Sequence, residues 1–113
     1  MCSSDLAGAV RIHEGRRVVM LASRGCTLTD TAMFRSAPAV TSRPVMTCLK
    51  EGEPERPSLA TGTRVSALWR TEARSTIAGR SGWWYRVQVV TTRELAATAT
   101  GWIFGAFLKE DPQ

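Results

Sequence analysis

Hydrophobic and polar residues alternate with a period of two along several short stretches of the chain, which is the pattern of half-buried β-strands. In WWYRVQVV (83–90) the odd-numbered residues are aromatic or aliphatic, and the polar residues Arg86 and Gln88 lie on the other face. The segments TRVSALW (63–69) and RPVMTCL (43–49) alternate in the same way. A shorter strand is predicted in TLTDTAMFRSAP (27–38), and GWIFGAFL (101–108) supplies the last one.

Polar segments rich in turn residues separate these strands. They cover residues 50–62, 70–82 and 91–100, and the last of them could hold one helical turn at 94–97. No stretch has the 3.6-residue period of an amphipathic helix. About five short strands in a chain of this length predict an all-β fold with long loops. We expect a small barrel, because closing the sheet removes its unpaired edges.

The amino-terminal part, residues 1–26, is poorly patterned and is assigned to an extension that precedes the barrel at 27–108. Its first six residues, MCSSDL, resemble a translated sequencing-adapter end, so we expect the native amino terminus to be missing. The rest either forms a hairpin around Glu14–Gly15 or is a loose extension. Residues 109–113 are expected to be a polar tail.

Composition and charge restrict the possible protein classes and partners only slightly. The chain has 113 residues, enough for one domain, and its longest apolar run, Val18–Ala22, is far shorter than the ~20 residues that cross a bilayer. No transmembrane segment is therefore expected. The formal charge is +5, which would suit a polyanion, but the arginines are scattered rather than clustered.

The three cysteines are Cys2, Cys26 and Cys48. Their number is odd and no Cys-x-x-Cys pair occurs, so a zinc site or a redox motif is not predicted, and no metal or other cofactor is expected. A Cys26–Cys48 disulfide would fit an oxidising compartment, whereas two buried free thiols are the interpretation that we favour.

Nothing in the sequence predicts catalysis. His13 is the single histidine and lies outside the patterned region. Neither Cys26 nor Cys48 has a visible partner for a nucleophilic pair. The glutamates of residues 51–55 belong to a flexible loop, and no phosphate-binding loop motif is present. We therefore do not expect an enzyme.

Five pieces of the chain, taken in order, resemble the bacterial SH3 (SH3b) family. They are MFRSAP (33–38), PVMTCLKEG (44–52), GTRVSAL (62–68), GWWYRV (82–87) and GWIFGAFL (101–108). The closing Trp-Tyr-x-Val and Gly-Trp-Ile pieces are the most specific. The resemblance implies an SH3-like barrel that acts as a binding module attached to peptidoglycan or to a protein partner.

The sequence departs from the family pattern in its loops. One family glycine usually serves both the second and the third piece, whereas here Gly52 and Gly62 divide that role, which implies an insertion of about ten residues. The loops at 70–82 and 91–100 are also longer than usual. The longer loops make it harder to assign the binding residues of the family to positions in this chain.

The aromatic residues divide between core and ligand site. Trp83 follows a loop, where full burial is difficult, and a large indole there is suited to ligand contact, with Trp69 beside it. Trp84 is interpreted as a structural residue that packs the barrel, but it falls on the face of Arg86, so either a bulge turns it inward or it stays partly exposed. Trp102 is assigned to the core, with Phe104 on the same strand face and Ile103 on the opposite one; Phe107 and Leu108 are expected to seal one end of the barrel.

These assignments predict a non-catalytic binding module in the bacterial cell envelope or a secreted protein. The candidate ligand-binding residues are Trp83, Trp69 and Tyr85 for stacking, and Arg86, Arg80 and Arg70 for carboxylates. The expected partner is peptidoglycan or an envelope protein, and the chain is expected to be a monomer. Two alternatives stay open: a purely structural or interaction domain without a small ligand and, less favoured, a basic barrel that binds nucleic acid.

Overall fold

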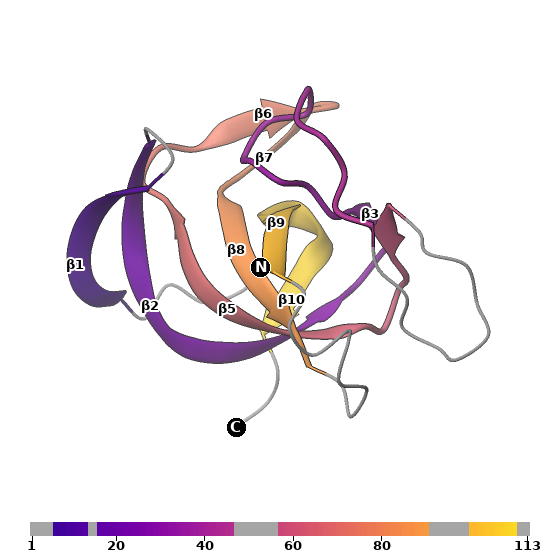
Figure 1. Cartoon of the computed structure of the whole chain (residues 1–113), viewed down its shortest axis with the longest axis horizontal. Coiled ribbons are helices and arrows are strands. Elements are labelled where there is room, and N and C mark those ends of the chain that lie inside the picture. Colours follow the sequence, from indigo (N-terminus) through magenta and orange to yellow (C-terminus); the bar gives the residue numbers. More distant parts are fainter. Residues whose placement is uncertain (1–5, 14–15, 47–56, 91–99, 111–113) are drawn as a thin grey trace.

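The computed structural model describes residues 6–13, 16–46, 57–90 and 100–110, and in this part the chain is all-β, as predicted (Figure 1). Its elements are β1 (Leu6–His13), β2 (Arg16–Leu28), β3 (Ala32–Met33), β4 (Ser58–Leu59), β5 (Arg64–Thr71), β6 (Ser75–Ile77), β7 (Arg80–Gly82), β8 (Trp84–Val89), β9 (Thr100–Phe104), the 3₁₀ turn η1 (Gly105–Phe107) and β10 (Leu108–Glu110). Within these ranges no helix is long and apolar enough to cross a membrane.

The main sheet has the strand order β1-β2-β5-β8-β9, and β10 pairs with the end of β2. The expected closure into a barrel is not seen, because no described pairing joins β9 to β10, although η1 links them directly. The outer edge of β9 is covered by another segment instead. The amide of Arg35 donates to the carbonyl of Trp102 at 2.9 Å, and the amide of Trp102 donates to the carbonyl of Arg35 at 2.7 Å. The result is an open sheet that curves around β9 and β10 (Figure 1).

The amino-terminal region belongs to this sheet. Strands β1 and β2 pair antiparallel, with His13 opposite Arg16, so the hairpin alternative is correct. Strand β2 runs through the boundary predicted after residue 26 and pairs with β1, β5 and β10. Burial of Val18 and Val19 explains why this stretch is a strand, although its sequence does not alternate cleanly.

Three polar segments contain strands that the pattern did not predict. Residues 50–62 include β4, whose Leu59 is fully buried and pairs with β3. Residues 70–82 form the β6–β7 hairpin around Ala78 and Gly79, which have φ of 52° and 78°. Such a turn matches the twist of a two-residue hairpin, but alanine rarely adopts a positive φ, so the residue types at 78–79 did not predict the hairpin. Strand β10 takes up Lys109 and Glu110 of the expected tail.

Some predictions fall partly or wholly outside the described residues. Of the strand expected at 43–49, residues 43–46 are described, and Pro44 forms only an isolated bridge to Arg35. The helical turn expected at 94–97 and the glutamates of 51–55 lie outside the described ranges.

Side chains on opposite faces of β8 and β9 enter two different hydrophobic clusters. The main core receives alternate residues of both strands together with side chains from β2 to β5 and β10: Leu21, Cys26, Leu28, Ala32, Phe34, Leu59, Val65, Ala67, Tyr85, Val87, Val89, Ile103 and Leu108. The second cluster consists of Val18, Trp84, Trp102 and Phe104. Trp69, Ile77, Ala106 and Phe107 pack against it while partly exposed. Trp102 and Phe104 thus share one face and Ile103 takes the other, as predicted.

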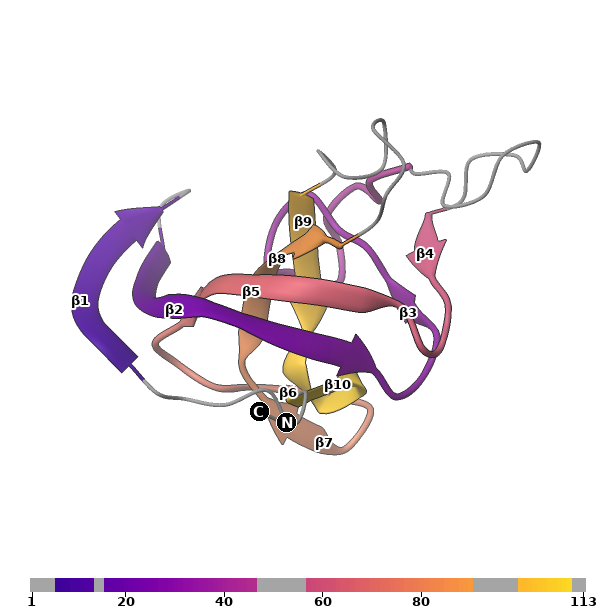
Figure 2. The ribbon, with the colours of Figure 1, turned by 90° about the horizontal axis from the view of Figure 1, so that it is seen from below.

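Trp84 differs from both alternatives that the sequence suggested. Strand β8 pairs with β9 in an unshifted register, so no bulge turns Trp84 toward the main core. It nevertheless has only 3% of its surface exposed, because the second cluster covers it. Part of that cover comes from the β6–β7 hairpin, which lies beside η1 (Figure 2).

Gly101 and Gly105 permit a close approach of the backbone to two buried aromatic rings. A Cβ on Gly101 would lie 2.7 Å from a ring carbon of Phe34, and one on Gly105 would lie 2.5 Å from a ring carbon of Tyr85. Both distances are shorter than a contact between two non-bonded carbon atoms can be. Only glycine therefore lets the backbone of β9 and η1 approach these rings.

Cys26 is fully buried in the main core and forms a disulfide. The favoured interpretation, two free thiols, is therefore wrong for this residue. Its partner cysteine lies outside the described residues, so the Cys26–Cys48 pairing stays a prediction. A disulfide from β2 restricts the unfolded chain and adds stability to a small domain.

We expect Cys26→Ser, or reduction of the native chain, to lower the free energy of unfolding by about 2–4 kcal/mol. Urea unfolding with and without a phosphine reductant measures the loss. Of Cys2→Ser and Cys48→Ser, the variant that matches the effect identifies the partner. An unchanged midpoint under reduction would contradict a stabilising bond.

Candidate binding groove

The six ligand-binding residues predicted from the sequence do not form one site. In the register of β5 and β8, Arg70 stands opposite Tyr85 and Trp69 stands opposite Arg86. Neighbouring positions on a strand point to opposite faces, so these two pairs lie on different faces of the sheet. Trp69 therefore does not join Trp83, which packs against the main core.

Trp83 is half-buried, and its ring is already in contact with two arginines. The guanidinium carbon of Arg70 lies 4.2 Å from the ring centroid and that of Arg74 lies 4.7 Å from it. Such cation–π contacts contribute about 0.5–2 kcal/mol each, more when water is excluded. The indole thus has a structural role in holding two cations, one of which, Arg74, the sequence did not single out.

Tyr85 and Arg70 are not available to a ligand, which corrects their predicted roles. Tyr85 is fully buried. Arg70 is 8% exposed, and its Nη1 donates to the carbonyl of Thr71 at 2.9 Å. Burial raises the pKa of the Tyr85 phenol above its usual value of 10.0, and the nearby positive charges of Arg70 and Arg74 oppose that rise.

The other two predicted arginines have partners within the protein. Arg86 is half-buried, and its Nη2 donates to Oγ1 of Thr100 at 3.0 Å. Arg80 is exposed, donates from Nη2 to the carbonyl of Ala106 at 3.0 Å, and lies 5.1 Å from the ring centroid of Phe107. Arg80 is the one of the pair that remains at the surface.

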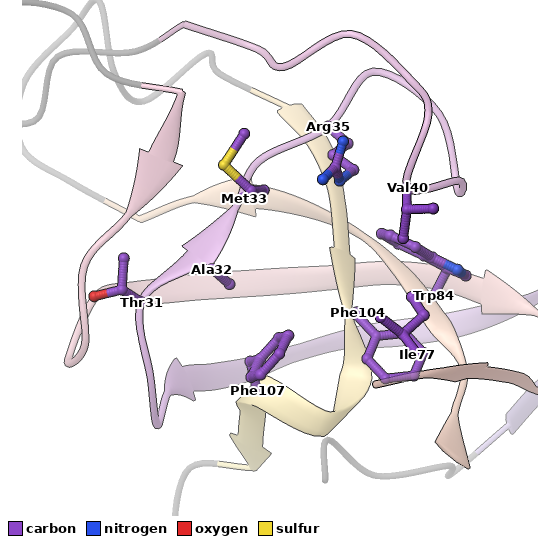
Figure 3. A pocket seen from close by; sticks show the side chains of 9 residues that line it. All are labelled: Thr31, Ala32, Met33, Arg35, Val40, Ile77, Trp84, Phe104 and Phe107. Atoms are coloured by element: carbon purple, nitrogen blue, oxygen red, sulfur yellow. The ribbon is translucent and has the colours of Figure 1, made fainter. Parts of the chain in front are cut away.

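A groove of about 190 Å³ lies where the second cluster meets β3 (Figure 3). Its lining residues come from five segments of the chain: Thr31, Ala32, Met33, Arg35, Val40, Ile77, Trp84, Phe104 and Phe107. All except Thr31 and Arg35 are apolar. Such a lining binds apolar groups, with a few polar side chains left to orient them.

The floor of the groove is buried and its rim is exposed. Trp84 and Phe104 are each 3% exposed and meet edge to face, with 5.5 Å between ring centroids. Phe104 makes a second edge contact with Phe107 at 6.1 Å. On the rim, Met33 and Val40 are 38% and 51% exposed. Large apolar side chains left this open around an aromatic floor are typical of an interaction surface.

One wall of the groove is a compact loop between Arg35 and Ser42. The Arg35 guanidinium donates to the carbonyl of Ser42 at 3.1 Å. The Ser42 hydroxyl lies within hydrogen-bond distance of the carbonyls of Ala37 and Ala39, at 2.9 and 2.6 Å. The amide of Ser36 donates to the carbonyl of Arg43 and closes the loop. These bonds fix Val40 at the rim before any ligand binds.

The sequence did not reveal this groove because its walls come from regions interpreted as connections. Val40 follows the proline that was taken to end a strand, and Ile77 lies in the segment predicted to be a polar loop. The available signal was the isolated apolar residue in each polar segment. Phe107 was assigned only to sealing one end of the barrel.

Comparison with known proteins does not assign the chain to a family. No protein-family model matches it, and no curated protein or solved structure matches it.

Deprotonation of Tyr85 makes the fold less stable as the pH rises in the alkaline range. Its folded pKa is raised, so the unfolded chain loses this proton first as the pH increases. Below about pH 10 the titration of Tyr85 leaves the free energy of unfolding unchanged. Above this pH the free energy of unfolding falls by up to about 1.4 kcal/mol per pH unit. Urea unfolding between pH 9 and 11 should show this slope in the native sequence.

The matched variant is Tyr85→Phe, which should lose the Tyr85 contribution to this slope. Because the chain has a single tyrosine, tyrosinate absorbance follows the group directly and should rise at higher pH in the folded than in the unfolded chain. Identical titration curves in the two states would contradict the burial of the phenol.

Proposed function

We propose that this protein is a non-catalytic binding module whose groove takes apolar side chains of an extended peptide segment. The observation that carries the proposal is the exposed apolar rim of Met33 and Val40 over the buried aromatic floor. Transfer of these two side chains from water to a ligand supplies the driving force, because apolar area removed from water is worth about 25 cal/mol per Å².

The bacterial SH3 resemblance supports this site. Three of the five matching pieces meet at the groove: MFRSAP supplies Met33 and Arg35, GWWYRV supplies Trp84, and GWIFGAFL supplies Phe104 and Phe107. Segments far apart in the sequence therefore contribute residues to one surface.

The charged residues at the groove favour a ligand that also carries a carboxylate. Arg35 lines the groove, and Arg80 lies over the ring of the lining residue Phe107. The planar guanidinium group suits carboxylates. Stem peptides of peptidoglycan and acidic segments of partner proteins both combine small apolar side chains with such groups. We propose the peptidoglycan peptide as the ligand and a protein segment as its alternative.

The disulfide at Cys26 supports a location outside the cytoplasm, in the cell envelope or the surrounding medium. Disulfides persist in oxidising compartments and are rare where glutathione keeps thiols reduced. The same compartment gives access to peptidoglycan.

The size of the groove suits weak binding. At about 190 Å³ it is smaller than typical small-molecule pockets, which run from about 300 Å³ upward. We expect dissociation constants in the micromolar range or weaker, so firm attachment requires a second contact on the same ligand or a tethered domain.

Co-sedimentation of the chain with purified peptidoglycan, at low and high salt, tests the proposal. We expect pelleting that survives high salt, and about tenfold weaker binding for Met33→Ser and Val40→Ser, because each removes a rim contact worth about 1.5 kcal/mol. Both side chains are exposed, so the fold should tolerate the changes.

Met46→Ser is the matched control, because Met46 is 48% exposed but does not line the groove. It should bind like the native chain. Equal losses for Met33→Ser and Met46→Ser would contradict the groove. Failure of the native chain to pellet would remove peptidoglycan as the ligand, and a segment of a partner protein would then be the ligand to test in the groove.

A further inference from the structure

A second, basic hollow of about 670 Å³ lies between the start of β2 and the connection from β5 to β6. Figure 1 shows these two segments side by side. The hollow is lined by Arg16, Arg17, Thr71, Glu72, Ala73, Arg74 and Ser75. Apart from Ala73, every one of these side chains is charged or carries a hydroxyl, which separates this surface from the apolar groove.

Positive charge exceeds negative charge around the hollow. Glu72 is its one acidic lining residue, and its carboxylate pairs with Nε of Arg17. The side chains of Arg16 and Arg74 are both exposed and make no hydrogen bond or ion pair with other described residues. Two cations therefore face the hollow without a described acidic partner, and their mutual repulsion would be relieved by a bound anion.

The hollow is partly organised in advance. Arg17 is held by Glu72, and Arg74 is held by its contact with the Trp83 ring, 4.7 Å from the centroid. Arg70, over the same ring, adds a buried positive charge whose Nε has no hydrogen-bond partner among the described residues. Arginines fixed in this way lose less conformational entropy when they bind an oxyanion.

We propose that this hollow is a binding site for the phosphate groups of an anionic polymer. Arg16 and Arg74 supply planar guanidinium groups that bind phosphate oxygens in pairs, and the Ser75 hydroxyl supplies a further donor. The polymer is a non-nucleic polyol phosphate of the cell exterior. A single-stranded nucleic acid would need an aromatic face on which to stack its bases, and the Trp83 ring is already in contact with Arg70 and Arg74. The choice of a cell-exterior polymer rests on the location proposed from the Cys26 disulfide.

This site does not depend on the groove. The two nevertheless border the same short segment, because Arg74 and Ser75 line the hollow and Ile77 lines the groove. A module that holds a peptide in one site and a phosphate polymer in the other would gain affinity from both. That gain supplies the second contact that the small groove needs.

Calorimetric titration of the chain with poly(glycerol phosphate), at two salt concentrations, tests the site. We expect measurable binding at low salt that Arg16→Gln and Arg74→Gln each weaken about fivefold to tenfold. Glu72→Gln should strengthen binding, because it removes the negative charge of the one acidic residue that lines the hollow. Thermal unfolding of each variant shows that the fold is retained.

Arg43→Gln is the charge-matched control, because Arg43 is exposed and lies outside the hollow. It should bind like the native chain. If it weakens binding as much as Arg74→Gln, net charge alone explains the interaction and the site is wrong. If the native chain does not bind poly(glycerol phosphate), or binds oligothymidylate as tightly, the assignment to a polyol-phosphate polymer is also overturned. Peptidoglycan binding through the groove is a separate result and is unaffected by either outcome.

Discussion

The pairing of β8 with β9 is the constraint on which the rest of the structure depends. Both strands bury side chains on both faces: Tyr85 and Ile103 enter the main core, and Trp84 and Trp102 enter the second cluster. At about 1.5–3 kcal/mol for each large apolar side chain, exposing the second cluster would cost an amount comparable to the whole stability of a domain, about 5–15 kcal/mol. The sheet therefore needs a second cover, which the β6–β7 hairpin and η1 provide.

Both candidate sites lie at the borders of the β6–β7 hairpin and η1. Near β3, Trp84 and Phe104 are buried while Met33 and Val40 stay exposed, and these residues line the groove. The connection that carries the chain from β5 into the hairpin places Arg74 beside Arg16, and this is the basic hollow. Thr71 links β8 to the connection between β5 and β6. Its hydroxyl accepts a hydrogen bond from the amide of Trp84 and lies 2.9 Å from the carbonyl of Ala73.

The sequence predicted what depends on local alternation and missed what depends on distant partners. The period of two placed Trp102 and Phe104 on one face of the last strand and Ile103 on the other, as observed. It could not show that Trp84 would be buried on the other face, because its cover includes Val18 and Ile77 from remote segments. The irregular pattern of β2 hid a central strand, since its register shifts between Met20 and Arg24. The ligand-site prediction failed for Tyr85 because spacing alone does not distinguish a buried ring from an exposed one.

Native-state hydrogen exchange tests most directly whether the β8–β9 pair is the stable centre of the fold. The amides that pair β8 with β9 should exchange only through global unfolding, with protection equal to the free energy measured in urea. The amides of the edge strand β1 should exchange through local opening, orders of magnitude faster. Equal protection of β1 and of the β8–β9 pair would contradict this account, as would exchange of Tyr85 and Ile103 at a denaturant concentration where β2 and β5 stay protected.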